Sequence, residues 1–408
     1  MSLTCHTRKA AQAQAARILS TYSADTFGVC SALFELGGMV VIHDPSGCNS
    51  TYTTHDEPRW YDTDSLIFIS AMTEYDAILG RDDKLIAEIA DAARELKPKF
   101  ICLIPSQIAF LIATDLTAVT KLVEKETRIP CFTLPTNSMH YYASGIYLAL
   151  EKIAQWAAKK GKKKNQPVKE PRLNLLGVTP LDFPLRGTRA SLTAFLTQAG
   201  FSLGACWALG ESLENLLASA DADMSLVLTY GGLGAARVLA RECGIPYVVG
   251  TPFPPLQAKL ADTLRKAVPS TPKEERCTRP CYSLEKLPAK NGKENFLIGE
   301  SIFAASLAAA LEQSTGRHFR IIVPVEHEDA LLPPDALALT TESELVPVLA
   351  DAALVLADPL YAAIVPTGVP FIALPHAAFS GRLYQKEERN LLSPEEYAAL
   401  VNEIPRTR

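Results

Sequence analysis

The sequence predicts an α/β protein of three units, each a parallel sheet sandwiched between helices. Short apolar runs alternate with helix-like runs along most of the 408 residues. These apolar runs lack the polar alternation of a half-exposed strand, which indicates burial on both faces. A helix, a turn ending in proline and a short apolar strand also occur three times, at Pro130, Pro246 and Pro370. The repeats are roughly 115–125 residues apart, the size of an ordinary domain.

The first unit has the clearest pattern of elements. In Arg81–Leu96 the apolar residues recur at a spacing of three to four, which is typical of an amphipathic helix. The predicted strands are Gly38–His43, Leu66–Ala71, Lys99–Ile104 and Cys131–Leu134, and the other predicted helices are Leu116–Glu126 and Tyr141–Lys159.

Two charged, proline-containing stretches without apolar periodicity separate the units. They are Lys159–Arg172 and Val268–Lys293, which we interpret as linkers. The predicted domains are therefore residues 20–160, 172–268 and 294–380, followed by a C-terminal extension at 381–408.

Composition excludes several classes of protein. A net charge of −5, from 40 Lys and Arg against 45 Asp and Glu, argues against a nucleic-acid binder. No apolar run approaches the roughly 20 residues of a membrane span. The polar start lacks the apolar core of a secretion signal, so the nine cysteines indicate thiols or metal ligands in a cytoplasmic protein.

Cys30 and Cys48 are candidate iron–sulfur ligands. Cys48 follows Gly47 in the loop after the first predicted strand, where parallel sheets bind ligands. Common clusters take four cysteines, so two from one chain would require a cluster shared between two chains. The alternative is a pair of buried thiols that pack as small apolar side chains.

A glycine run follows the predicted strand Ser225–Tyr230. Gly231–Ala236 resembles a loose dinucleotide-binding fingerprint, but the next strand, Tyr247–Pro252, ends without the acid that would bind a ribose. The alternative is close packing of a helix on the strand.

Two histidines are candidate proton donors. His376 follows the last predicted strand, where a histidine can bind metal, shuttle protons or make a structural hydrogen bond. His55 belongs to the charged run His55–Arg59, which either lines the same cavity as Cys48 or forms a solvated loop.

Taken together, these residues resemble the nitrogenase component 1 family. Four motifs in the family's order carry the resemblance: the Cys30 to Cys48 spacing, Ile69–Gly80, Leu111–Leu116 and Leu374–Gly381. The resemblance implies three Rossmann-like domains around a central cleft.

The resemblance also implies roles for individual residues. Cys30 and Cys48 match cluster cysteines, but the third cluster position falls near Ser106 or Gln107, where there is no cysteine. This favours a 4Fe–4S cluster shared between two protomers over an eight-iron cluster. Thr229 stands at the position of the cysteine that holds the family's active-site cofactor, and His376 at that of the histidine. Threonine supplies no thiolate, which argues against dinitrogen reduction.

These observations lead to one main hypothesis of function. The chain is predicted to be a nitrogenase-like oxidoreductase component that pairs with a copy of itself or with a related component 1 subunit. An iron-protein-like ATPase would deliver electrons through an iron–sulfur cluster at the protomer interface to an unidentified substrate in the cleft. His376 and His55 would act there, and the cleft could also hold a second metallocofactor or a tetrapyrrole.

Two other hypotheses remain open from the sequence. One is a non-catalytic scaffold that assembles or carries a metallocofactor. The other is a nucleotide- or sugar-binding α/β protein whose cysteines are structural.

Overall fold

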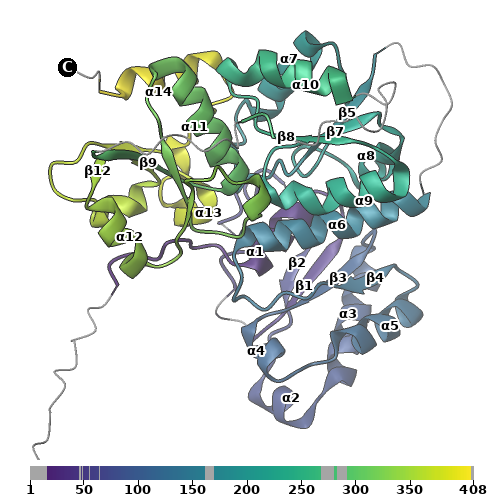
Figure 1. The fold of residues 1–408 in the computed structure, drawn as a ribbon. Coiled ribbons are helices and arrows are strands. Elements are labelled where there is room, and N and C mark those ends of the chain that lie inside the picture. Colours follow the sequence, from purple (N-terminus) through teal and green to yellow (C-terminus); the bar gives the residue numbers. More distant parts are fainter. Residues whose placement is uncertain are drawn as a thin grey trace, which may run out of the picture.

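The chain forms three separate parallel sheets, each flanked by helices (Figure 1). The computed structural model describes residues 16–45, 47, 49–54, 56–63, 65–160, 170–267, 280–282 and 292–405. Within this part the sheets have four, four and five strands, and the strands pair in parallel throughout, apart from one isolated antiparallel bridge between Ala24 and Tyr141. The predicted α/β class is confirmed.

The first sheet has the strand order β2-β1-β3-β4. Its elements, in chain order, are α1 (Asp25–Leu33), β1 (Met39–His43), β2 (Ile67–Ile69), α2 (Glu74–Leu79), α3 (Asp82–Leu96), β3 (Ile101–Pro105), α4 (Gln107–Leu111), α5 (Leu116–Thr127), β4 (Cys131–Thr133) and α6 (Tyr142–Lys160).

Both faces of this sheet are buried, as its unalternating strands predict. Val40 and Ile42 of β1 belong to the main core with α1 and α6, while Met39 and Val41 pack with α3 and α5 on the opposite face. Side chains along a strand point alternately to the two faces, so a strand covered on both sides reads as continuously apolar.

The second sheet has the order β6-β5-β7-β8. Its elements are β5 (Arg172–Leu176), α7 (Thr188–Ala199), β6 (Ser202–Cys206), α8 (Leu213–Ala218), β7 (Met224–Val227), α9 (Leu233–Cys243), β8 (Tyr247–Val249) and α10 (Gln257–Ala267).

The glycine run after β7 serves helix–strand packing. A Cβ atom on Gly232 would lie 2.6 Å from the carbonyl oxygen of Leu176 in β5. Only glycine fits there, and this supports the packing interpretation of the run over a dinucleotide site. Strand β7 also ends earlier than predicted, at Val227, because Tyr230 already begins a short 3₁₀ turn.

The third sheet has the order β11-β10-β9-β12-β13. Its elements are β9 (Glu294–Ile298), α11 (Ser301–Thr315), β10 (Arg320–Val323), β11 (Leu337–Ala338), α12 (Glu342–Leu349), β12 (Ala352–Ala357), β13 (Phe371–Ala373), α13 (Ala377–Ser380) and α14 (Pro394–Glu403).

The domain boundaries remain a prediction, but two features bear on them. Helix α6 packs on α1 and on α9, so it is shared between the first and second units (Figure 1). It extends to Lys160, into the predicted linker, and residues 161–169 lie outside the described part. In the predicted C-terminal extension, Leu391 and Leu392 are buried in the main core. In the described part, no helix is long and apolar enough to cross a membrane.

Helices α1 and α6 cross at two glycines. A Cβ atom on Gly145 would lie 1.8 Å from the carbonyl oxygen of Asp25, and one on Gly28 would lie 2.0 Å from that of Tyr142. The obstacles are backbone atoms, which cannot rotate away. The helices therefore approach as closely as they do because neither glycine has a side chain.

We expect Gly145→Ala to destabilise the chain by about 1–3 kcal/mol, because the helices must separate to admit the methyl group. Urea unfolding followed by circular dichroism measures the change. Lys159→Ala on the exposed end of α6 is the control and should change stability by less than about 0.5 kcal/mol. Equal stability of the two variants would contradict the proposed close crossing.

Candidate functional site

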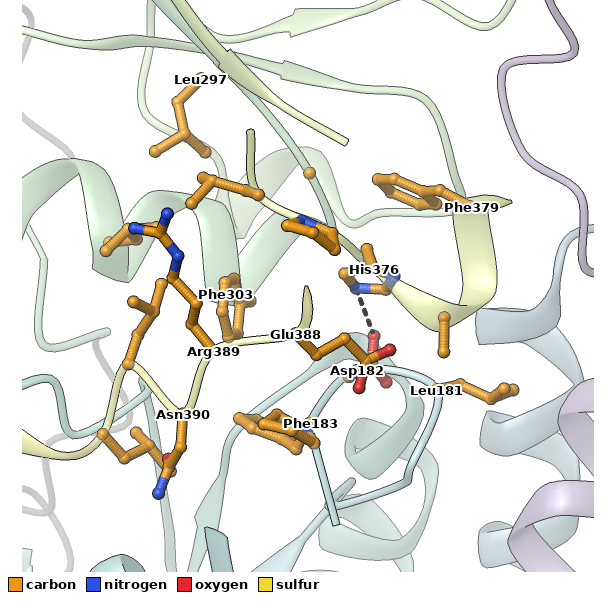
Figure 2. A pocket seen from close by; sticks show the side chains of 18 of the residues that line it. Leu181, Asp182, Phe183, Leu297, Phe303, His376, Phe379, Glu388, Arg389 and Asn390 are labelled. Atoms are coloured by element: carbon orange, nitrogen blue, oxygen red, sulfur yellow. Dashed lines mark ion pairs between the residues drawn. The ribbon is translucent and has the colours of Figure 1, made fainter. Parts of the chain in front are cut away.

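A small cavity lies where the second sheet, the third sheet and the C-terminal segment meet (Figure 2). Its volume is about 40 Å³. Since a water molecule needs roughly 10–15 Å³ of such space, the cavity has room for only a few. Several lining segments follow the carboxyl ends of strands, where α/β sheets bind ligands. The apolar part of the lining is Leu181, Phe183, Pro184, Phe253, Leu297, Ile298, Phe303, Leu307, Leu374, Pro375, Ala377, Phe379, Leu391 and Leu392.

Asp182 is the polar centre of one wall. It lies in the turn after β5 and is 6% exposed. Its carboxylate accepts hydrogen bonds from the hydroxyl of Tyr142 at 2.5 Å and from that of Thr179 at 3.1 Å. Tyr142 belongs to α6, so this contact ties the cavity wall to the helix shared by the first two units.

His376 faces Asp182 across the cavity (Figure 2). Its Nε2 atom lies 3.5 Å from Oδ1 of Asp182, and its side chain is 9% exposed. The pair has the separation of an ion pair without the geometry of a hydrogen bond, and neither ring nitrogen has a hydrogen-bond partner among the described residues. Burial works to lower the pKa of His376, but the carboxylates of Asp182, Asp358 and Glu388 outweigh it and raise that pKa above its ordinary value. The imidazole is therefore held as a charged proton donor.

Asp358 fixes the backbone that carries His376. Its carboxylate accepts hydrogen bonds from the amide of His376 at 2.9 Å, the hydroxyl of Ser380 at 2.8 Å and the amide of Leu360 at 2.9 Å. The imidazole also stacks on the ring of Phe379, with the ring centroids 4.4 Å apart. These contacts leave the imidazole little freedom to turn away from the cavity.

Glu388 is the third titratable group in the lining, and sequence reasoning missed it. It belongs to the C-terminal segment between the 3₁₀ turn Gln385–Glu387 and α14. Its Oε1 atom is buried and has no hydrogen-bond partner in the described part of the chain. Burial raises the pKa of Glu388 to about 8; Asp358 adds to this increase, and His376 opposes it.

Two of the predicted cofactor residues lie away from the cavity lining. The hydroxyl of Thr229 is buried and donates a hydrogen bond to the carbonyl of Gly177 at 2.7 Å. Ser106 is 1% exposed at the start of α4, and its hydroxyl has no partner among the described residues. Their roles in cofactor binding remain predictions. Of the predicted residues that the structure describes, only His376 lines the cavity.

Cys30 is fully buried in α1 and packs in the main core. Burial raises the pKa of its thiol, with a further contribution from the carboxylate of Glu57. A metal ligand must be a thiolate, and this environment favours the neutral thiol.

Cys48 and His55 lie outside the described residues, so their predicted roles remain predictions. The residues after His55 correct the solvated-loop alternative: Asp56, Glu57 and Arg59 are 6%, 1% and 3% exposed. They are buried because Arg59 pairs with Glu57 at 2.6 Å, and because Asp56 accepts a hydrogen bond from the hydroxyl of Tyr22 at 2.7 Å.

The described residues do not fit an iron–sulfur cluster. They contain no group of three or more His, Cys, Asp or Glu side chains placed to hold a metal ion. Cys30, the one predicted cluster ligand among them, is enclosed by its own chain and cannot reach a second protomer as folded. The cavity is likewise far below the roughly 300–1,000 Å³ of pockets that bury ligands of drug size, so a tetrapyrrole or large metallocofactor does not fit it in this conformation.

Comparison with curated proteins gives distant relatives of one kind, all of them the same component of light-independent protochlorophyllide reductase. The chain is 23% identical over 261 residues to that component from Gloeothece citriformis, covering 59% of this chain and 51% of that protein. It is 26% identical over 220 residues to the one from Prosthecochloris aestuarii, covering 52% of this chain and 39% of that protein. The chain thus spans about half the length of the first of these relatives, and less of the second.

Solved structures match over nearly the whole chain. "Nitrogenase Cp1 at pH 6.5" superposes with a TM-score of 0.66 at 13% identity, over 96% of this chain and 93% of that one. At that identity the match establishes the fold alone. A sequence profile described as nitrogenase component 1 type oxidoreductase matches residues 25–325, which is most of the chain. The resemblance of the sequence motifs is thereby confirmed, and the chain belongs to the nitrogenase component 1 type oxidoreductase family.

Proposed function

We propose that this chain is a nitrogenase-like reductase component whose substrate is reduced in the cavity beside His376. The observation that carries the proposal is the unpartnered imidazole of His376, charged against Asp182 and facing an apolar cavity at the strand ends. A charged imidazole in a site that excludes water is suited to protonating a substrate as electrons arrive. The protein's part is to bind and orient the substrate and to supply protons.

Family membership supports the proposed source of electrons. The family generally binds iron–sulfur clusters and works with an iron-protein-like partner and a related subunit. Bound clusters supply single-electron transfer. We retain Cys48 as a proposed cluster ligand. Cys30 becomes a ligand only if α1 rearranges, and we derive no step through it.

An exposed apolar edge of the first sheet supports a partner surface. It consists of residues of α2, α4 and their flanks, both of which follow strands paired with β1 and so lie at the same edge (Figure 1). Tyr75 and Ile78 are each 73% exposed. Contiguous exposed apolar side chains mark interaction sites in soluble proteins. The residues of this apolar edge are Phe68, Tyr75, Ile78, Leu79, Ile108, Phe110, Leu111 and Ile112.

Electron transfer tests the proposal without knowledge of the substrate. We would mix the full chain, purified without oxygen, with a reduced iron-protein-type ATPase and ATP, and follow oxidation of the reductase by its visible absorption. We expect oxidation that requires both ATP and the chain. Ile78→Asp on the apolar edge should slow it at least tenfold, and Asp83→Asn on the exposed start of α3 should not.

The opposite results are equally clear. If the reductase stays reduced with the wild-type chain, the proposed function is wrong. Transfer of bound iron and sulfide to a recipient protein would then favour the scaffold hypothesis. Iron analysis of the wild type beside Cys48→Ser and Cys30→Ser tests the ligands: we expect a loss of iron from Cys48→Ser and none from Cys30→Ser.

A further inference from the structure

The C-terminal segment brings an acid to the cavity that neither the sequence motifs nor the comparisons identify. Glu388 lies on the segment that crosses the cavity, and its carboxyl group turns toward Asp182 and His376 (Figure 2). The Oε1 atom of Glu388 and both ring nitrogens of His376 are buried without a hydrogen-bond partner in the described part of the chain. Buried polar atoms are rarely left unpaired, so two such groups at one cavity indicate a ligand that completes them.

The charges around Glu388 determine its protonation state. The carboxylate of Asp358, the imidazole of His376 and the amide of Ala377 act on it, and Asp182 lies on the facing wall. Burial dominates and raises the pKa of Glu388 to about 8, so the group is a neutral acid at pH 7. Glu388 then has a proton to donate, as does the imidazolium of His376.

We propose that Glu388 and His376 are paired proton donors, and that the substrate of this site is a small, neutral organic molecule with an unsaturated, hydrogen-bond-accepting group such as a ketone or an imine. This inference rests on the proposed reductase function and names its substrate class and a second catalytic residue. Two donors aimed at one cavity select an acceptor group on the ligand.

The rest of the cavity sets the size and charge of the substrate. Its walls are otherwise mainly apolar, and 40 Å³ admits only a few heavy atoms. An anion would meet the carboxylate of Asp182. The guanidinium in the lining, that of Arg389, is engaged by Glu403 at 2.6 Å. A neutral substrate with an apolar remainder therefore fits this lining better than a charged one.

The two donors balance a two-electron reduction. The unsaturated bond X=Y takes up two electrons from the one-electron reductase partner and two protons, and becomes HX–YH. One proton leaves the carboxylic acid of Glu388 and the other leaves the imidazolium of His376. The products on the protein are a glutamate carboxylate and a neutral imidazole, which solvent must protonate again before the next turnover.

Infrared spectroscopy tests the inference on the full chain without reductase. We expect a protonated carboxyl band in the wild type that titrates near pH 8 and is absent from Glu388→Gln. Acetone, used as a small ketone probe, should shift this band and should show its own carbonyl band moved to lower frequency by hydrogen bonding. Glu387→Gln, at an exposed position on the same segment, is the matched control and should behave as the wild type.

Two results would overturn the inference. One is an ionised Glu388 at pH 7, seen as no difference between the wild type and Glu388→Gln. The other is a neutral Glu388 whose band acetone leaves unchanged. These outcomes are independent of the proposed function: acetone binding without electron transfer would leave the donors in place and overturn only the reductase proposal.

Discussion

Asp182→Asn is expected to lower the pKa of His376 below the ordinary value of a histidine and to destabilise the chain by about 2–3 kcal/mol near pH 6. Asparagine keeps the shape and can still accept the hydrogen bond from Tyr142. It removes the charge that opposes the effect of burial on His376, whose side chain is 9% exposed. With that charge gone, burial determines the pKa and favours the neutral ring.

The pH dependence follows from the sign of the shift. The folded chain raises the pKa of His376, so the stability that this pairing contributes is fully present below the unfolded pKa of about 6.5. It is lost as the pH rises through the higher, folded pKa. Wild type and Asp182→Asn should therefore differ most at pH 6, and the difference should shrink in alkaline solution.

Two measurements check this prediction. Titration of histidine ring protons by NMR gives the pKa, with His376→Gln used to assign the signal. Urea unfolding at pH 6 and above pH 8 gives the stability. Asp329→Asn is the matched control, since Asp329 lies 3.3 Å from His327 but its side chain is 97% exposed. It should change stability by less than about 1 kcal/mol. An unchanged pKa of His376 in Asp182→Asn would show that the two groups are not coupled.

The fold could be predicted from local sequence because its pattern is local. The strands of the first sheet are covered on both faces, and their unbroken apolar runs follow directly from that burial. His376 could be predicted as a site residue for a similar reason, since it stands immediately after the last strand.

The rest of the site depends on contacts between distant segments. Asp182 and Glu388 meet His376 only because the third unit and the C-terminal segment fold onto the second. The sequence predicts no more than an extension at residues 381–408, and nothing local to Glu388 marks it as buried. A signal for Asp182 did exist, because it lies in a turn shortly after a strand, where parallel sheets bind ligands.

Cys30 illustrates the opposite difficulty. A cysteine near glycines has the composition of a cluster ligand, but its direction depends on which side of α1 faces α6. The glycine crossing of those two helices places this turn of α1 in the core. Spacing along the chain does not contain that information.

Arg59→Met is expected to destabilise the chain by about 3–5 kcal/mol, because it removes a buried cation from a cluster of buried partners. The guanidinium pairs with Glu57 at 2.6 Å and with Glu35 at 3.1 Å, and it donates hydrogen bonds to the carbonyl groups of Ser31 and Ala208. Methionine fills a similar volume but leaves the buried carboxylate of Glu57 without its cation. The Ala208 contact also means that the first and second units lose a connection.

A double variant separates the cost of the unpaired charge from the loss of contacts. The side chain of Glu57 is 1% exposed, so most of the damage in Arg59→Met should come from leaving that carboxylate charged and buried. Glu57→Gln combined with Arg59→Met should therefore recover at least half of the stability in urea unfolding. Arg94→Met, which breaks pairs of a 64% exposed side chain, should cost less than about 1 kcal/mol. If the double variant is no more stable than Arg59→Met, the loss comes from the contacts that Arg59 makes with Ser31 and Ala208, and the argument from buried charge fails.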